Sequence, residues 1–202
     1  MALNNQRKSK VSPVTALVFQ GGIGVVGLLV ILVADIPVQM FGAGLLPSVL
    51  YGALGALCTY GALLLLTQIP ALFPDNLDRQ MRGLHRFASG YSWFVLFLLS
   101  VFAGVGEELL FRGAVQGWLA VHTDTTTAVL AASVLFGLVH YASFTYFVIA
   151  TGLGLVLGLA YALSDSILLV MVWHGVYDMV ALFCLLRFPE WFGISGHPED
   201  QD

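Results

Sequence analysis

The sequence predicts an all-α, polytopic membrane protein, a bundle of about six transmembrane helices that encloses a polar intramembrane cavity. Three observations lead to this prediction. The 202-residue chain is 58% hydrophobic and only 10% charged, whereas soluble domains carry about 25% charged residues. Its apolar residues come in runs of roughly 20, the length that spans a bilayer as a helix. The few ionisable residues inside these runs lie on different segments, and burying each alone would be costly, which favours one shared cavity.

The apolar runs can be marked as helices in chain order. The first could be mistaken for a signal peptide, because basic residues precede it. Asp35, Ile36 and Pro37 follow it in place of a small-residue cleavage site, so we interpret it as a retained span. The expected spans are 14–33, 45–66, 91–110, 127–141, 144–163 and 167–186.

The placement of lysine and arginine predicts the orientation of the bundle. Basic residues precede the first span, lie in the long loop 68–90 and follow the last span, whereas the loops expected on the opposite face contain none. By the positive-inside rule, both termini should be cytoplasmic in a multi-pass protein of the cell membrane. The residues that carry this prediction are Arg7, Lys8, Lys10, Arg79, Arg82, Arg86 and Arg187.

The chain is expected to form a single membrane domain, 1–202, without internal repeats. Leu77, Met81 and Leu84 recur at helical spacing and predict a short interfacial helix in the long loop. The acidic tail 197–202 lacks apolar residues and is expected to be disordered. Both cysteines fall in apolar runs, which argues against a disulfide framework. No basic patch large enough for nucleic acid is present.

Two adjacent carboxylates, Glu107 and Glu108, end an apolar run. A charge at bilayer depth costs roughly 2.5 to 3.5 kcal/mol on insertion scales, so such residues usually pair, line a cavity or do chemistry. Arg112 lies four residues after Glu108 and shares its helix face, whereas Glu107 lies about 100° round the helix. The spacing allows one division in which Arg112 holds Glu108 and Glu107 is freer to face a cavity. Two close carboxylates at low dielectric make one of the two glutamates a candidate general base. The alternative is an ion pair that only fixes helix packing.

Two histidines supply further polar groups. His140 follows Phe136 by four residues, and His174 precedes Asp178 by four. The second spacing predicts that Asp178 accepts a hydrogen bond from one ring nitrogen of His174 and directs the other at the site. A lone histidine in an apolar helix is often only a hydrogen-bonded packing residue. If the third helix continues beyond Arg112, however, the glutamates lie near mid-membrane, where they can share one cavity with the histidines.

This residue set allows two mechanisms. In one, His140, His174 and Glu107 hold Zn²⁺, the candidate cofactor, and the other glutamate acts as base. In the other, a glutamate activates water directly and the histidines orient it or stabilise the oxyanion. No His-Glu-x-x-His motif is present, so the spacing does not select the metal.

The motifs Glu-Glu-x-x-x-Arg, Phe-x-x-x-His and His-x-x-x-Asp, in this order on successive membrane segments, resemble the CPBP (Abi) family. This family includes the type II CAAX prenyl endopeptidases and bacterial bacteriocin-processing or immunity proteins. The resemblance covers 91–186, the expected catalytic core, and the first two spans carry no family motif. The matching residues are Glu107, Glu108, Arg112, Phe136, His140, His174 and Asp178.

The resemblance implies an intramembrane endopeptidase with Glu107, Glu108, His140 and His174 as catalytic residues. The glutamates would activate water, His140 would join them, and His174 would support the site or the oxyanion. Arg112, Phe136 and Asp178 would have supporting roles. The chain is similar to a short prokaryotic member, so the expected partners are the lipid bilayer and a membrane peptide or bacteriocin precursor. Two alternatives compete: a non-catalytic immunity or scaffold protein that binds a membrane peptide, and an ion-coupled transporter.

Overall fold

The computed structural model describes residues 11–42, 44–67, 69 and 77–194. These residues form helices and turns without any strand, which confirms the predicted all-α class. The expected tail 197–202 and the basic residues of the N-terminal segment lie outside the described residues. Within these described ranges, five helical spans are long and apolar enough to cross a membrane: α1 (Pro13–Val33), α2 (Leu45–Leu66), the continuous Trp93–His122, α7 (Phe144–Ser164) and α8 (Ile167–Arg187).

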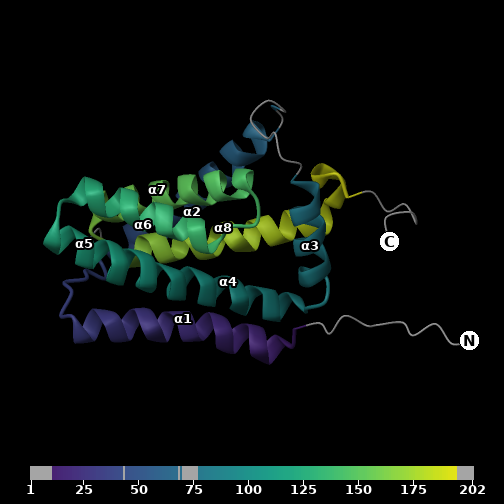
Figure 1. The fold of residues 1–202 in the computed structure, drawn as a ribbon. Coiled ribbons are helices and arrows are strands. Elements are labelled where there is room, and N and C mark those ends of the chain that lie inside the picture. Colours follow the sequence, from purple (N-terminus) through teal and green to yellow (C-terminus); the bar gives the residue numbers. More distant parts are fainter. Residues whose placement is uncertain (1–10, 43, 68, 70–76, 195–202) are drawn as a thin grey trace, which may run out of the picture.

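The fourth expected span, 127–141, is shorter than a bilayer is thick. It is α6 (Thr125–Val139), an apolar helix of 15 residues, which extends about 22 Å at 1.5 Å per residue, against a hydrocarbon core of about 30 Å. It nevertheless runs back along the bundle between α5 (Gly117–His122) and α7. The beginning of α1 and the end of α8 therefore lie at the same end of the molecule (Figure 1).

Most of the spans begin at a polar residue that can bind the free backbone N–H groups of a first helical turn. Ser92 accepts from the amide of Val95 at the start of α4 (Trp93–Glu108), and Asp124 accepts from Thr127 at the start of α6. Such caps stabilise a helix by about 1 kcal/mol each. The same role is taken by Ser12 in α1, Ser143 in α7 and Ser166 in α8.

The third span is longer than the sequence predicted. The expected helix 91–110 continues through the π-helical segment η2 (Leu109–Gln116) and through α5 to His122. Glu107 is the fifteenth of the 30 residues of this span, so both glutamates lie near its middle. The π-helical turn follows them directly, and such widened turns occur frequently at functional sites.

Glycines allow the helices that carry the polar residues to approach one another closely. A Cβ on Gly104 of α4 would lie 2.6 Å from the carbonyl oxygen of Met171 and 2.7 Å from the amide nitrogen of Gly175, both in α8. A Cβ on Gly24 of α1 would lie 3.0 Å from the Cα of Gly106. Small residues of this kind allow membrane helices to make close van der Waals contacts.

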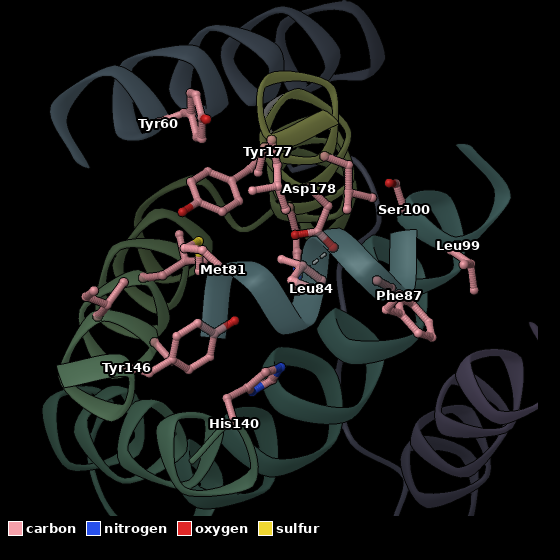
Figure 2. A pocket seen from close by; sticks show the side chains of 18 of the residues that line it. Tyr60, Met81, Leu84, Phe87, Leu99, Ser100, His140, Tyr146, Tyr177 and Asp178 are labelled. Carbon is pink, nitrogen blue, oxygen red and sulfur yellow. Dashed lines mark ion pairs between the residues drawn. The ribbon is translucent and has the colours of Figure 1, made fainter. Parts of the chain in front are cut away.

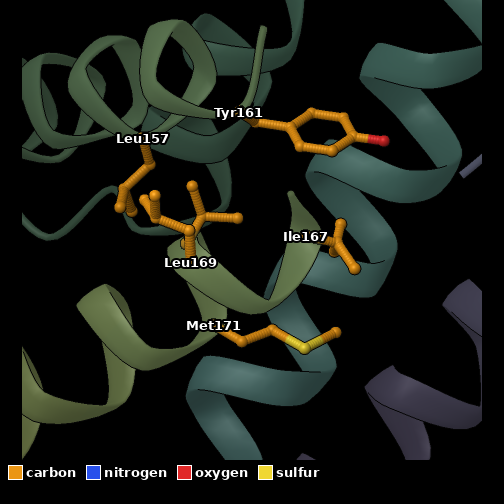
Figure 3. Close-up of a cluster of buried hydrophobic side chains, with 6 residues drawn as sticks. Leu157, Tyr161, Ile167, Leu169 and Met171 are labelled. Atoms are coloured by element: carbon orange, nitrogen blue, oxygen red, sulfur yellow. The ribbon is translucent and has the colours of Figure 1, made fainter. Parts of the chain in front are cut away.

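Apolar side chains hold α7 and α8 together near the turn that connects them. Leu157 and Tyr161 of α7 pack with Ile167, Leu169 and Met171 of α8 in one buried cluster (Figure 3). Towards the other ends of these two helices, the side chains between them line a cavity instead.

The predicted interfacial helix is α3 (Asp78–Ala88). It lies across the end of the bundle where α4 begins and α8 ends (Figure 1). Met81, Leu84 and Phe87 line the cavity beneath it, whereas Arg79 and Arg86 are exposed. The spacing predicted a helix here, and in the structure one face of this helix covers the bundle while the other carries positive charge.

Candidate functional site

A large cavity runs from the middle of the bundle to the end covered by α3. It encloses about 1070 Å³ and is lined by residues of α1, α2, α3, α4, α6, α7 and α8. His140 and Tyr146 face Asp178 and Tyr177 across it (Figure 2). Glu107 and His174 line its deep part, and the lining towards α3 is mainly apolar. The cavity therefore joins a polar centre to an apolar channel at one end of the molecule.

Glu108 and Arg112 form an ion pair in the protein interior. The Arg112 Nε lies 3.1 Å from Oε2 of Glu108, and both side chains are at most 1% exposed. The guanidinium also donates from Nη2 to the carbonyl oxygen of Gly154 at 3.0 Å, and its carbon lies 4.8 Å from the centre of the Phe136 ring. Arg112 therefore connects the third span to α6 and α7 while it neutralises Glu108.

A second polar contact repeats this link one turn further on. Gln116 Nε2 donates to the carbonyl oxygen of Gly158 at 3.0 Å. Arg112 and Gln116 are four residues apart, as are their acceptors Gly154 and Gly158 on α7. Two donors thus hold α7 against η2 at a fixed register.

Glu107 points into the cavity. Its Oε1 accepts a hydrogen bond of 2.6 Å from Nε2 of Gln20 on α1. Its Oε2 lies 3.4 Å from Nε2 of His140 and 3.9 Å from Nε2 of His174. Among the described residues Oε2 has no direct hydrogen-bond partner. One oxygen of the carboxylate is therefore held, and the other faces two imidazoles.

His140 ends α6 and turns its ring towards Glu107. Its Nδ1 lies 2.8 Å from the carbonyl oxygen of Phe136, which can only accept, so Nδ1 is the donor. This hydrogen bond directs Nε2 at the cavity. The Phe136 ring packs against the His140 ring with centroids 4.3 Å apart and against His174 at 5.9 Å.

His174 is held by Glu108, which corrects the prediction made for Asp178. Its Nδ1 lies 2.7 Å from Oε1 of Glu108. Asp178 lies near the other nitrogen, with its Oδ2 3.7 Å from Nε2, beyond hydrogen-bonding distance. His174 and Asp178 are close, as predicted, but the hydrogen bond to the ring is made by Glu108 of α4. Gly104 and Gly175 allow α4 and α8 to approach closely enough for this contact. Asp178 is left to line the cavity.

The side chains expected as Zn²⁺ ligands were His140, His174 and Glu107. Within the described residues, no group of three or more histidine, cysteine, aspartate or glutamate side chains is arranged to hold a metal ion. One nitrogen of each candidate histidine is bound, to Phe136 and to Glu108 respectively, and Nε2 of each faces Glu107. A hydrogen bond on one ring nitrogen is also usual for a histidine that binds a metal.

The structure brings together all the residues that the sequence singled out, and it adds one that sequence reasoning missed. Gln20 lies on α1, outside the motifs. Two signals could have identified it: it is a lone amide in an apolar run, and Gly24 and Gly27 follow it at i+4 and i+7, on the same helix face. Tyr146 and Tyr177, which line the cavity beside the polar centre, carried no comparable signal.

Comparison with known proteins gives one family. Residues 89–180 match the family model described as Rce1-like, type II CAAX prenyl endopeptidase Rce1-like. No curated protein and no solved structure matches the chain significantly. The matched region contains every motif residue from Glu107 to Asp178, whereas α1, α2 and α3 lie outside it.

Proposed function

We propose, from the Rce1-like domain that residues 89–180 form, that this multi-pass membrane protein is an intramembrane endopeptidase that hydrolyses a peptide bond in a membrane-associated peptide. The observation that carries the proposal is the position of Glu107. Its Oε2 faces Nε2 of His140 and of His174 at 3.4 and 3.9 Å in the deep part of a large cavity. A carboxylate, two imidazoles and room for a peptide are what base-catalysed hydrolysis needs.

In the proposed reaction, Glu107 is the general base. A water molecule bound between Oε2 of Glu107 and Nε2 of His140 gives a proton to the carboxylate while its oxygen attacks the peptide carbonyl carbon. When the C–N bond breaks, the same proton passes from Glu107 to the leaving amine nitrogen, which restores the carboxylate. His140 suits the role of holding the water because its Nδ1 is bound to Phe136 and its Nε2 is free to accept.

His174 is proposed to stabilise the oxyanion. Three carboxylate oxygens, from Glu107, Glu108 and Asp178, lie within 4 Å of its ring nitrogens, which is the environment that an imidazolium requires. Nδ1–H then donates to Glu108, and Nε2–H can donate to the developing oxyanion. Asp178, at the cavity surface, orients this second nitrogen without binding it.

We propose that the substrate enters from the cytoplasmic side. The cavity extends to the end of the bundle where α3 lies and where Arg79, Arg82, Arg86 and Arg187 gather. The positive-inside rule assigns that end to the cytoplasm. The apolar lining from Leu84 of α3 and Leu185 of α8 suits an apolar peptide segment.

The side of access can be measured with cysteine labelling. In a background where Cys58 and Cys184 are alanine, we expect Tyr146→Cys, in the cavity, to react with a membrane-impermeant maleimide in inside-out vesicles only. The matched control is Thr123→Cys, in the exposed turn at the opposite end, which should react only in right-side-out vesicles. Labelling of Tyr146→Cys from the outer face alone would contradict cytoplasmic entry.

The proposed mechanism also predicts the effect of metal removal. Purified protein dialysed exhaustively against chelator should retain its activity, because no step depends on a bound metal. If Zn²⁺ were held by His140, His174 and Glu107, activity would instead fall with the chelator and return with zinc. Zinc content measured for the wild type and for His140→Ala is the control, since only a zinc site requires the metal to leave with that side chain.

Reconstitution tests the proposed class of function. The protein in liposomes is incubated with membrane peptides, and new peptide termini are identified by mass spectrometry. An endopeptidase produces termini that increase with time and protein concentration. An immunity or scaffold protein binds the peptide without producing them, and this outcome would refute the proposal.

A further inference from the structure

The first helix reaches the polar centre, although it lies outside the Rce1-like domain. Gln20 of α1 donates from Nε2 to Oε1 of Glu107 over 2.6 Å, the shortest side-chain contact that Glu107 makes among the described residues. An ionised carboxylate can only accept, so the amide nitrogen is the donor. The hydrogen bond links residues that are 87 positions apart in the chain.

α1 packs so closely against the third span that the position of Gln20 is fixed. A Cβ on Gly24 would lie 3.0 Å from the Cα of Gly106, the residue before Glu107, and a Cβ on Gly27 would lie 2.6 Å from the amide nitrogen of Leu110. A side chain at Gly27 would therefore force α1 away from the third span, and a Cβ at Gly24 would already be in very tight contact with it. Gln20, Gly24 and Gly27 share one face of α1, which places the amide beside the carboxylate.

We propose that Gln20 is a positioning residue for the reaction, an inference that rests on the proposed function. It binds Oε1 and so fixes the rotation of the Glu107 carboxylate. Oε2 is then presented to His140 and His174, where the attacking water is to be held. Without the amide, the carboxylate can rotate and the base oxygen is no longer aligned. α1 thereby completes a site whose motifs all lie on other helices.

The test is Gln20→Leu, which keeps the side chain's approximate volume and removes its donor. We expect kcat to fall about ten-fold or more, because misplacing a catalytic group by about 1 Å can cost 10²-fold. KM should stay within about two-fold of wild type, since the substrate still binds the same cavity. The unfolding midpoint in detergent should be unchanged. Gln20→Asn, whose amide is one methylene short, should also lose kcat.

Glycine variants of α1 provide matched controls. Gly22 has no atom within 4 Å of a built Cβ, so Gly22→Leu should keep wild-type kcat. Gly24→Leu should move α1 away from α4 and lower kcat as Gln20→Leu does. The double variant of Gln20 and Gly24 should be no slower than the slower single variant, because both changes remove the same contact.

Three results would overturn the inference: unchanged kcat in Gln20→Leu, a rise in KM at constant kcat, or a loss of activity that only follows a loss of folded protein in both Gln20 variants. The outcome is separable from that of the proposed function. If Glu107→Gln inactivates the protein while Gln20→Leu does not, only the role of Gln20 is refuted. If Glu107→Gln is fully active, the role of Glu107 as the base is refuted, and if the wild type produces no new peptide termini, the proposed function itself is refuted.

Discussion

Glu107→Gln is expected to lower peptide hydrolysis by about 10²- to 10⁴-fold, the range that a general base contributes. Glutamine keeps the size and polarity of the side chain but cannot take a proton from water. Its carbonyl oxygen can still accept from Gln20, so the protein should insert, accumulate and unfold like the wild type. The measurement is the rate of product formation in liposomes, normalised to folded protein.

A matched variant separates the chemistry from the packing. Glu108→Gln also removes one carboxylate, but this one is fully buried and paired with Arg112 and His174. We expect it to lose stability together with activity, because it leaves the buried guanidinium unpaired. Activity of Glu107→Gln within a few-fold of wild type would be incompatible with Glu107 as the base.

Arg112→Leu is expected to destabilise the fold by about 3 to 5 kcal/mol, the usual effect of removing one partner from a buried ion pair. The substitution leaves the Glu108 carboxylate, which is 0% exposed, without its cation. It also removes the donor to Gly154 that holds α7 against the third span. Unfolding in detergent and the yield of monodisperse protein measure the effect.

The double variant Glu108→Gln with Arg112→Leu tests whether charge is the cause. Removing both charges leaves no unpaired ion in the interior, so the double variant should be more stable than Arg112→Leu alone. Any stability that the double variant still lacks relative to wild type would come from the lost hydrogen bond to Gly154 and the lost packing on Phe136. A double variant that is less stable than Arg112→Leu would show that the ion pair is not what Arg112 contributes.

Composition and spacing were enough to predict the class of fold and most of the polar centre. A bilayer requires helices of a certain length, so the apolar runs indicated where the spans lie. The helical spacing of Leu77, Met81 and Leu84 indicated the short helix α3. A separation of four residues places Glu108 and Arg112 on one helix face, and the structure contains the ion pair between them. The cost of burying Glu107, His140 and His174 separately favoured one cavity, and their side chains do meet there.

The bounds of the third and fourth helices followed less well from the sequence. Hydropathy does not show that the third span continues for 30 residues through a π-helical turn, because its polar residues interrupt the apolar run. α6 is shorter than a full span, since its ends are set by the cap Asp124 and by the turn at His140. The bounds of both helices depend on their contacts with the neighbouring helices.

Within a single helix, then, the sequence by itself determined which side chains share a face, because these positions follow from helical geometry. Between helices, only the tertiary structure decided the partners. Glu108 rather than Asp178 binds His174, since Gly104 and Gly175 let α4 and α8 approach closely. Gln20 reaches Glu107 across 87 positions because two glycines dock α1 against α4. A contact between helices depends on how far apart they are and how each is rotated about its axis. Packing fixes both quantities, and the spacing of residues along one helix does not specify them.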